Sequence, residues 1–277
     1  MWAHRPWVGR HLPSTTPQGR ELEAYARCVN AVEGNTTFYA LPSVDTVERW
    51  ASQVGESFRF VFKLPRVITH DRRLRDVDAL VASFVELVAP LGRSIGGLTF
   101  QLPASFGPGE LDAIDRVLAR APAAVRWSVE VRHPDFFDDP GRSALGRVLA
   151  RRGAERVLLD SRALFSQPPR SEAGREAWGK KPRVPALTEA IGDGPIVRFI
   201  GSDDRDITDA ALAEWVPIVA DWLADGRTPA FFVHTPDNLD APAFARHFHA
   251  QVRCSHPGTL PLPEPVPIEP VEQQSLF

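Results

Sequence analysis

The sequence alternates between short strand patterns and amphipathic helix patterns along almost its whole length. Alternating or continuous apolar residues predict strands at 31–39, 58–65, 96–103, 126–133, 155–162, 195–202 and 229–235. Apolar residues at helical spacing predict helices at 17–30, 43–54, 76–89, 109–121, 142–152, 185–191, 209–225 and from residue 240 onward. Repeated strand–helix units with short connections require a parallel sheet that is covered by helices.

Two features favour a closed (β/α)8 TIM barrel over an open doubly wound sheet, which would also satisfy the alternation. The number of units is close to eight, and the strands carry charged residues at alternate positions. A charge is costly inside a sheet that is buried on both faces, whereas the upper layer of a barrel faces an open mouth. No Gly-x-Gly-x-x-Gly loop follows a strand, so the sequence offers no nucleotide cofactor motif.

The first strand of such a barrel is missing or truncated at the N-terminus. Residues 1–16 (MWAHRPWVGRHLPSTT) show no strand pattern, and we expect the native start codon to lie upstream of Met1. The barrel domain is predicted to span residues 1–255. Residues 256–277 are proline-rich and are expected to form a disordered C-terminal tail.

Composition narrows the classes of protein to which the chain could belong. No apolar run in its 277 residues approaches the ~20 needed to span a bilayer, and we expect a cytoplasmic protein. Its two cysteines are too few for a disulfide framework. A net charge of −3 argues against a surface built throughout for duplex DNA, although it permits a local basic patch.

Successive side chains of a strand point to opposite faces, and in successive strands of this sequence polar side chains fall on the same face, here called one phase. They lie near the carboxyl ends of the strands, where barrels place their active sites. The residues in this phase are Glu33, Asn35, Lys63, Gln101, Glu130, Arg132, Asp160, Arg198 and His234. One interpretation of such a layer is purely structural, as a network in which opposite charges compensate each other. A functional pocket is the interpretation that we favour, because burying this many ionisable groups costs several kcal/mol per ion before pairing.

The residue types suggest chemistry but leave alternatives open. Lys63 is either an amine nucleophile or a fixed charge for a phosphate or carboxylate. Glu130 and Asp160 are either a general acid/base pair or ligands of a divalent metal together with His234. His70 and His133 follow strands toward the same mouth. The loop 163–184 is rich in Arg, Lys, Gly and Pro and is interpreted as a lid, a binding loop or a disordered segment.

Four motifs resemble the YecE-like family, the domain of unknown function numbered 72. They read VEGNTTFYALPSVDTVERWA, FRFVFKLPRVITHDRRL, LTFQLPASF and SVEVRH, and the match runs from about Trp2 to Cys254. The resemblance implies a barrel but no reaction. It carries motif positions over to Glu33, Asn35, Phe38, Tyr39, Lys63, Pro65, Thr69, His70, Gln101, Glu130, Arg132, His133, Asp160 and Arg198. The last strand departs from the family pattern at Val233-His234-Thr235-Pro236, where paired asparagines are usual.

Two functions are compatible with these residues. In the first, the chain is an enzyme, of the hydrolase or lyase type, that acts on a small or nucleic-acid-derived anionic substrate. Lys63 and Arg198 would hold the anion, and Glu130 and Asp160 would transfer protons or bind a metal. In the second, the chain is a non-catalytic ligand-binding or adaptor module that uses the same pocket.

The C-terminal peptide suggests a partner. Residues 273–277 (QQSLF) resemble the short peptide by which bacterial proteins dock on the DNA polymerase sliding clamp. Gln273 would supply hydrogen bonds, and Leu276 and Phe277 would be adjacent apolar anchors at the end of a proline-rich spacer. A chance match in a disordered end is the alternative.

We predict that a labelled peptide of residues 264–277 binds the purified sliding clamp of the source bacterium with a Kd on the order of micromolar. The peptide with Leu276→Ala and Phe277→Ala should not bind, and the same changes in the full protein should leave its melting temperature unchanged. An equal, negligible signal from both peptides would contradict the prediction.

Overall fold

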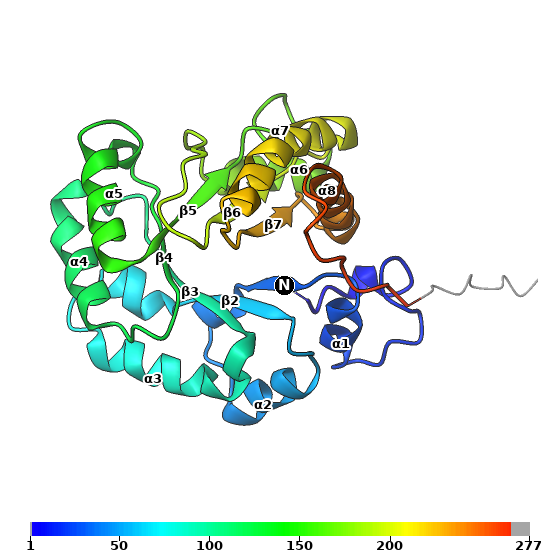
Figure 1. The fold of residues 1–277 in the computed structure, drawn as a ribbon, viewed down its shortest axis with the longest axis horizontal. Coiled ribbons are helices and arrows are strands. Elements are labelled where there is room, and N and C mark those ends of the chain that lie inside the picture. The colour runs from blue at the N-terminus through cyan, green and yellow to red at the C-terminus, as the bar shows by residue number, and fades with distance from the viewer. Residues whose placement is uncertain (1, 267–277) are drawn as a thin grey trace, which may run out of the picture.

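A computed structural model describes residues 2–266 and shows a mixed α/β structure built around one parallel sheet (Figure 1). The sheet order is β1-β2-β3-β4-β5-β6-β7, and every neighbouring pair is parallel. The strands are β1 (Ala31–Gly34), β2 (Arg59–Lys63), β3 (Ile95–Gln101), β4 (Trp127–Glu130), β5 (Glu155–Asp160), β6 (Ile196–Ile200) and β7 (Ala230–His234).

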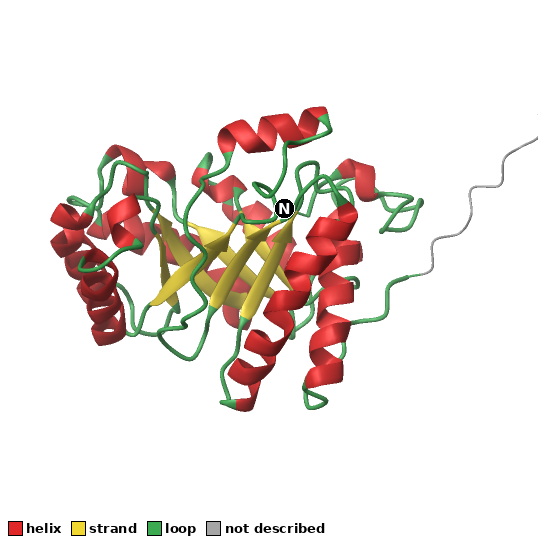
Figure 2. Cartoon of the chain, turned by 90° about the horizontal axis from the view of Figure 1, so that it is seen from above, coloured by secondary structure: helices red, strands yellow, loops and turns green. Residues whose placement is uncertain are grey.

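Helices surround the sheet on its outer side (Figure 2). They are α1 (Glu21–Ala26), α2 (Val44–Ser52), α3 (Asp78–Val88), α4 (Leu111–Arg120), α5 (Gly141–Arg152), α6 (Glu172–Lys180), α7 (Arg205–Ala224) and α8 (Ala241–Ser255). Their ends follow from local chemistry. The side chains of Ser43, Ser171 and Asp204 accept backbone N–H groups at the starts of α2, α6 and α7. Gly153 ends α5 in the left-handed conformation that favours glycine, at φ 61°.

Strand alternation separates an outer core from the barrel interior. Phe60, Phe62 and Phe100 point outward from β2 and β3 and pack beneath the helices, as Val197 and Phe199 do from β6. The opposite phase forms a small apolar layer inside the sheet, which comprises Ala31, Val61, Val157, Ile196, Ala230 and Phe232. The polar layer lies in the same inward phase, nearer the carboxyl ends of the strands.

The sheet is barrel-like and nearly closed. β1 and β7 contact each other, but among residues 2–266 no ladder of backbone hydrogen bonds joins them. Residues 2–20 add no strand to the sheet and hold a short 3-10 helix at Arg5–Trp7 and an isolated bridge between Val8 and Leu12. The predicted parallel, barrel-like architecture is therefore confirmed with seven strands.

Two predicted elements need correction. The segment 185–191 is not helical but irregular. The loop that follows it is tied to β5, because the N–H groups of Gly192 and Gly194 donate to the Glu155 carboxylate at 3.1 and 3.0 Å. The sixth helix lies earlier, at 172–180, inside the stretch interpreted as one long loop, and the Ser171 cap starts it.

The predicted C-terminal tail is described as far as residue 266. Residues 256–266 leave α8 without forming a helix or strand. Gln273, Leu276 and Phe277 lie outside the described residues. In the described part of the chain, no helix is long and apolar enough to cross a membrane.

A tight contact at the end of β1 gives a stability prediction. Gly34 pairs in register with the fully buried Phe62, and a Cβ atom at Gly34 would overlap the Phe62 ring. Gly34→Ala should therefore lower the free energy of unfolding by about 1–3 kcal/mol through overpacking. Gly55→Ala is the matched control because a Cβ there meets open space, and its effect should stay within about 0.5 kcal/mol. Equal unfolding midpoints in urea for the two variants would contradict the prediction.

Candidate functional site

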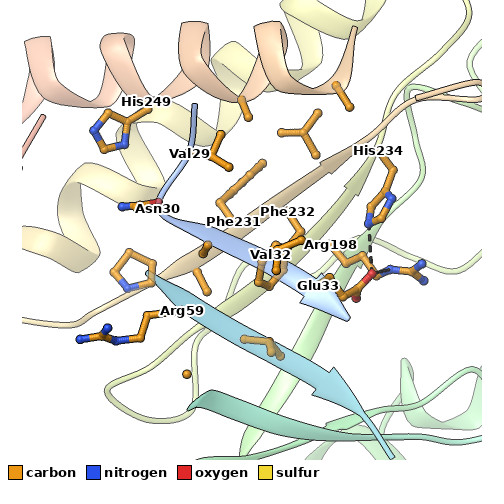
Figure 3. A pocket seen from close by; sticks show the side chains of 18 of the residues that line it. Val29, Asn30, Val32, Glu33, Arg59, Arg198, Phe231, Phe232, His234 and His249 are labelled. Atoms are coloured by element: carbon orange, nitrogen blue, oxygen red, sulfur yellow. Dashed lines mark hydrogen bonds and ion pairs between the residues drawn. The ribbon is translucent and has the colours of Figure 1, made fainter. Parts of the chain in front are cut away.

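Six of the seven strands place a polar side chain in the inward phase at or just beyond their carboxyl ends. These side chains are Glu33 from β1, Lys63 from β2, Gln101 from β3, Glu130 from β4, Arg132 two residues beyond β4, Arg198 from β6 and His234 from β7. Strand β5 differs, because Val157 and Leu159 take its inward positions. Figure 3 shows Glu33, Arg198 and His234 converging between β1 and β7.

Glu33 is the acceptor at the centre of this layer. Its Oε2 accepts from Arg198 Nε at 3.1 Å and from Asn35 Nδ2 at 2.9 Å. His234 Nε2 lies 3.2 Å from the same oxygen, and Lys63 Nζ lies 3.7 Å from Oε1. One carboxylate thus contacts side chains from three other strands and from the loop after β1.

Glu130 is the second carboxylate, and it is completely buried. Its Oε1 accepts from Arg132 Nε at 2.8 Å and from the terminal nitrogen of the same guanidinium at 2.5 Å. Its Oε2 has no hydrogen-bond partner among the described residues, although Arg198 and Lys63 nitrogens lie 3.7 and 3.8 Å away. This oxygen therefore keeps acceptor capacity at the centre of a cationic cluster.

Both carboxylates are ionised at neutral pH. Burial alone would raise the pKa of Glu130, but the charges of Arg132, Lys63 and Arg198 outweigh it and hold the pKa at about 2. Burial also acts against Glu33, and Arg198 and Lys63 again hold the pKa of that carboxyl well below its usual range. Neither group carries a proton to donate at pH 7.

The pKa values of Lys63 and His234 are also lowered, which favours the neutral form of these two bases. Burial, and then the nearby Arg198 charge, lower the pKa of Lys63 to about 8, while Glu33 and Glu130 offset part of the effect. Burial lowers the pKa of His234 to about 4 despite the adjacent Glu33. The imidazole is therefore neutral at pH 7, and Lys63 is the group of this layer that titrates near neutrality.

A cavity of about 1120 Å³ opens above the polar layer and continues downward beside β1 and β7. Glu33, Asn35, Lys63, Gln101, Arg132, Arg198 and His234 line its polar part, and Tyr39 lies at its rim with 81% of its surface exposed. Between β1 and β7 the wall is apolar and includes Val29, Phe231, Phe232, Phe248 and Val252. This apolar wall was not predicted from the sequence, although the alternation of Ala230, Phe232 and His234 on β7 could have indicated its inner part.

Asp160 requires a correction. It was expected in the cavity, but it shares the outward phase of β5 with Leu158 and faces the helices. Its carboxylate accepts from Trp215 Nε1 of α7 at 2.8 Å and from Arg162 Nε at 3.1 Å. Asp160 therefore anchors α7 and cannot form an acid/base pair with Glu130.

The same placement corrects the expected metal ligands. Glu130, Asp160 and His234 do not converge, because Asp160 lies on the other side of its strand. Within residues 2–266, no group of three or more His, Cys, Asp or Glu side chains is arranged to hold a metal ion.

The two loop histidines lie behind the cavity rather than in its wall. His70 Nδ1 bonds the Thr69 hydroxyl at 2.9 Å, and its ring packs edge-on against Phe38 at 5.0 Å. His133 Nδ1 accepts from Asp135 N at 3.3 Å and so caps the short helix Pro134–Phe136. Both histidines were predicted to line the cavity, and both instead make local contacts outside its wall.

Of the basic residues in the stretch 163–184, two reach the cavity. Lys180 and Lys181 line it, Lys180 pairs with Glu176 at 2.5 Å, and burial lowers the pKa of Lys181. The others are engaged elsewhere: Arg170 pairs with Asp204 at 2.9 Å, and Arg183 lies over the Phe165 ring. The stretch therefore brings positive charge to one side of the mouth.

Comparison with known proteins supports the family resemblance. The family model described as "Protein of unknown function DUF72" matches residues 1–268. The UPF0759 protein YecE of Escherichia coli is 42% identical over 278 residues, which cover 100% of this chain and 97% of that protein.

Solved structures of DUF72 family proteins share the fold. One from Thermotoga maritima has a TM-score of 0.69 at 18% identity and covers 91% of this chain and 96% of its own. Another from Enterococcus faecalis has a TM-score of 0.68 at 15% identity, with coverages of 97% and 98%.

The lowered pKa of Lys63 predicts how its reactivity depends on pH. The neutral amine should appear as the pH rises through about 8, well below the ordinary value of 10.5. Acetic anhydride labelling, mapped by mass spectrometry from pH 6 to 11, should therefore show half-maximal modification of Lys63 near pH 8. The profile of the exposed Lys180 in the same digest is the reference, and a Lys63 midpoint above 10 would contradict the prediction.

Proposed function

We propose that this chain, which belongs to the DUF72 family, binds a small or nucleic-acid-derived anion, a phosphate or carboxylate, in the cavity at the carboxyl ends of its strands and acts on it as an enzyme. The observation that carries the proposal is the charge of the cavity wall. Among the described residues that line the cavity near the carboxyl ends of the strands, one, Glu33, is acidic and five are basic: Lys63, Arg132, Lys180, Lys181 and Arg198.

This excess of positive charge is not compensated inside the polar layer. Lys63, Arg132, Arg198 and Lys181 surround the two carboxylates Glu33 and Glu130, and His234 is neutral at pH 7. Leaving cations uncompensated in a poorly hydrated site costs free energy, and an anionic ligand would offset that cost. Guanidinium groups also match the paired oxygens of phosphates and carboxylates.

The geometry suggests which groups would take part in a reaction. Lys63 titrates near neutrality and lines the cavity, so it is suited to proton transfer or to nucleophilic attack. Glu130 carries no proton at pH 7 and is placed to hold Arg132 and Lys63 in position. A hydrolase or lyase built on Lys63 is thus the form of the enzyme that we propose.

A non-catalytic binding module is the second candidate, because the same charges would hold an anion without changing it. Mass spectrometry of small molecules that co-purify with the protein would identify the ligand. Incubation of that molecule with fresh protein separates the two functions, since a catalyst converts it and a binding module returns it unchanged.

Two further assignments, the exact fold and a partner, are part of the proposal. The (β/α)8 TIM barrel is supported by the repeated strand–helix units and by the approach of β1 to β7. Recruitment to a sliding clamp through Gln273, Leu276 and Phe277 is supported by the sequence match alone.

Lys181 gives the test of anion binding. It is half-buried at the cavity, and it forms no ion pair within 4.0 Å among residues 2–266, so its replacement should leave the fold intact. Lys181→Met should weaken binding of inorganic phosphate in the cavity roughly tenfold with an unchanged melting temperature. Arg175→Met on the neighbouring helix α6, outside the cavity, is the control. Titration calorimetry that shows equal phosphate affinity in both variants would contradict the proposal.

A further inference from the structure

A second, smaller cavity lies on the helix-covered side of β5. Its volume is about 280 Å³, and it shares no lining residue with the cavity at the mouth. It lies between the first turns of α5 and the connection that leads to β6. Its walls are Asp139, Arg142, Ser143, Gly146, Arg156, Leu187, Glu189, Ala190 and Ile191.

Arg156 contributes a buried charge to this cavity. It projects from the outward phase of β5 and is 6% exposed, yet within residues 2–266 no carboxylate lies within 4.0 Å of its guanidinium. One terminal nitrogen donates to the Arg142 carbonyl at 3.2 Å, and the buried Nε has no hydrogen-bond partner in the described chain. A buried guanidinium that is left partly unbonded is costly, and such groups are normally paired.

Two carboxylates also line the cavity, but both are engaged away from Arg156: Asp139 accepts from the Ser143 hydroxyl at 2.5 Å, and Glu189 pairs with Arg142. Arg142 lines the same cavity, and its own charge is paired with the exposed Glu189. Arg142 and Ser143 belong to the first turn of α5, a twelve-residue helix whose N-terminus carries the positive end of the helix dipole. Burial, and then the neighbouring Arg142, lower the pKa of Arg156 to about 10, which is the direction expected for a cation without a counter-ion.

We propose that this cavity is a binding site for a small oxyanion, held by the buried guanidinium of Arg156 and by Arg142 at the start of α5. The volume admits a phosphate or a short carboxylate and excludes a nucleotide-sized ligand. The terminal nitrogens of Arg156, unlike its buried Nε, can donate to the oxygens of an oxyanion in the cavity. The site is independent of the function proposed for the mouth.

Inorganic phosphate is the probe for this site, and titration calorimetry is the measurement. The Lys181→Met background weakens binding at the mouth, and the part of the remaining heat that depends on Arg156 reports the second cavity. Phosphate should bind there with a Kd on the order of millimolar. Adding Arg156→Met should weaken this binding at least roughly tenfold, whereas adding Arg147→Met, exposed on the same helix and outside the cavity, should not change it.

A second variant guards against loss of folding in Arg156→Met. Ser143→Glu places a further carboxylate in the cavity, next to Asp139, and so opposes the entry of an anion. It should abolish the phosphate response while the protein still shows a cooperative melting transition. Crystals soaked in tungstate should also show an anomalous peak beside Arg156. Equal phosphate affinity in the Arg156→Met and Arg147→Met proteins, or a Ser143→Glu protein that binds phosphate like its parent, would overturn the proposal.

Discussion

The interaction on which the site depends is the sharing of Glu33 and Glu130 among Lys63, Arg132 and Arg198. Each of these groups is expensive to bury alone, and each becomes tolerable because the others lie within 4 Å. The strands supply this arrangement directly. Parallel strands in near register bring the same inward position of each strand to one level, so residues that are far apart in sequence form one layer.

The same physics explains how much the sequence could predict. Strand and helix alternation predicted the parallel sheet, because apolar periodicity reports burial directly. It also predicted the inward face of β1, β2, β3, β4, β6 and β7, because polar residues at alternate positions of these strands contrast with an apolar outward face. The convergence of Glu33, Lys63, Gln101, Arg132 and Arg198 follows from that phase.

Asp160 was predicted to face the cavity but faces the helices. In β5 charged residues occur on both faces, Glu155 on one and Arg156 and Asp160 on the other, so the alternation does not identify the inward face. The partner that settles the matter, Trp215, lies 55 residues away on α7. The predicted positions of His70 and His133 in the cavity were wrong because the orientation of loop side chains follows no periodicity. It depends on local contacts, here with Phe38 and Asp135.

The sharing of Glu33 has a consequence for how this chain can change over evolutionary time. Asn35, Arg198 and His234 all direct nitrogen atoms at one of its oxygens, and Lys63 faces the other. The loss of Glu33 would leave several buried donors without an acceptor at once, so its cost cannot be divided into separate pairwise energies. Substitutions in this layer are thus expected to be tolerated in combinations, and the positions should drift together across relatives rather than one at a time.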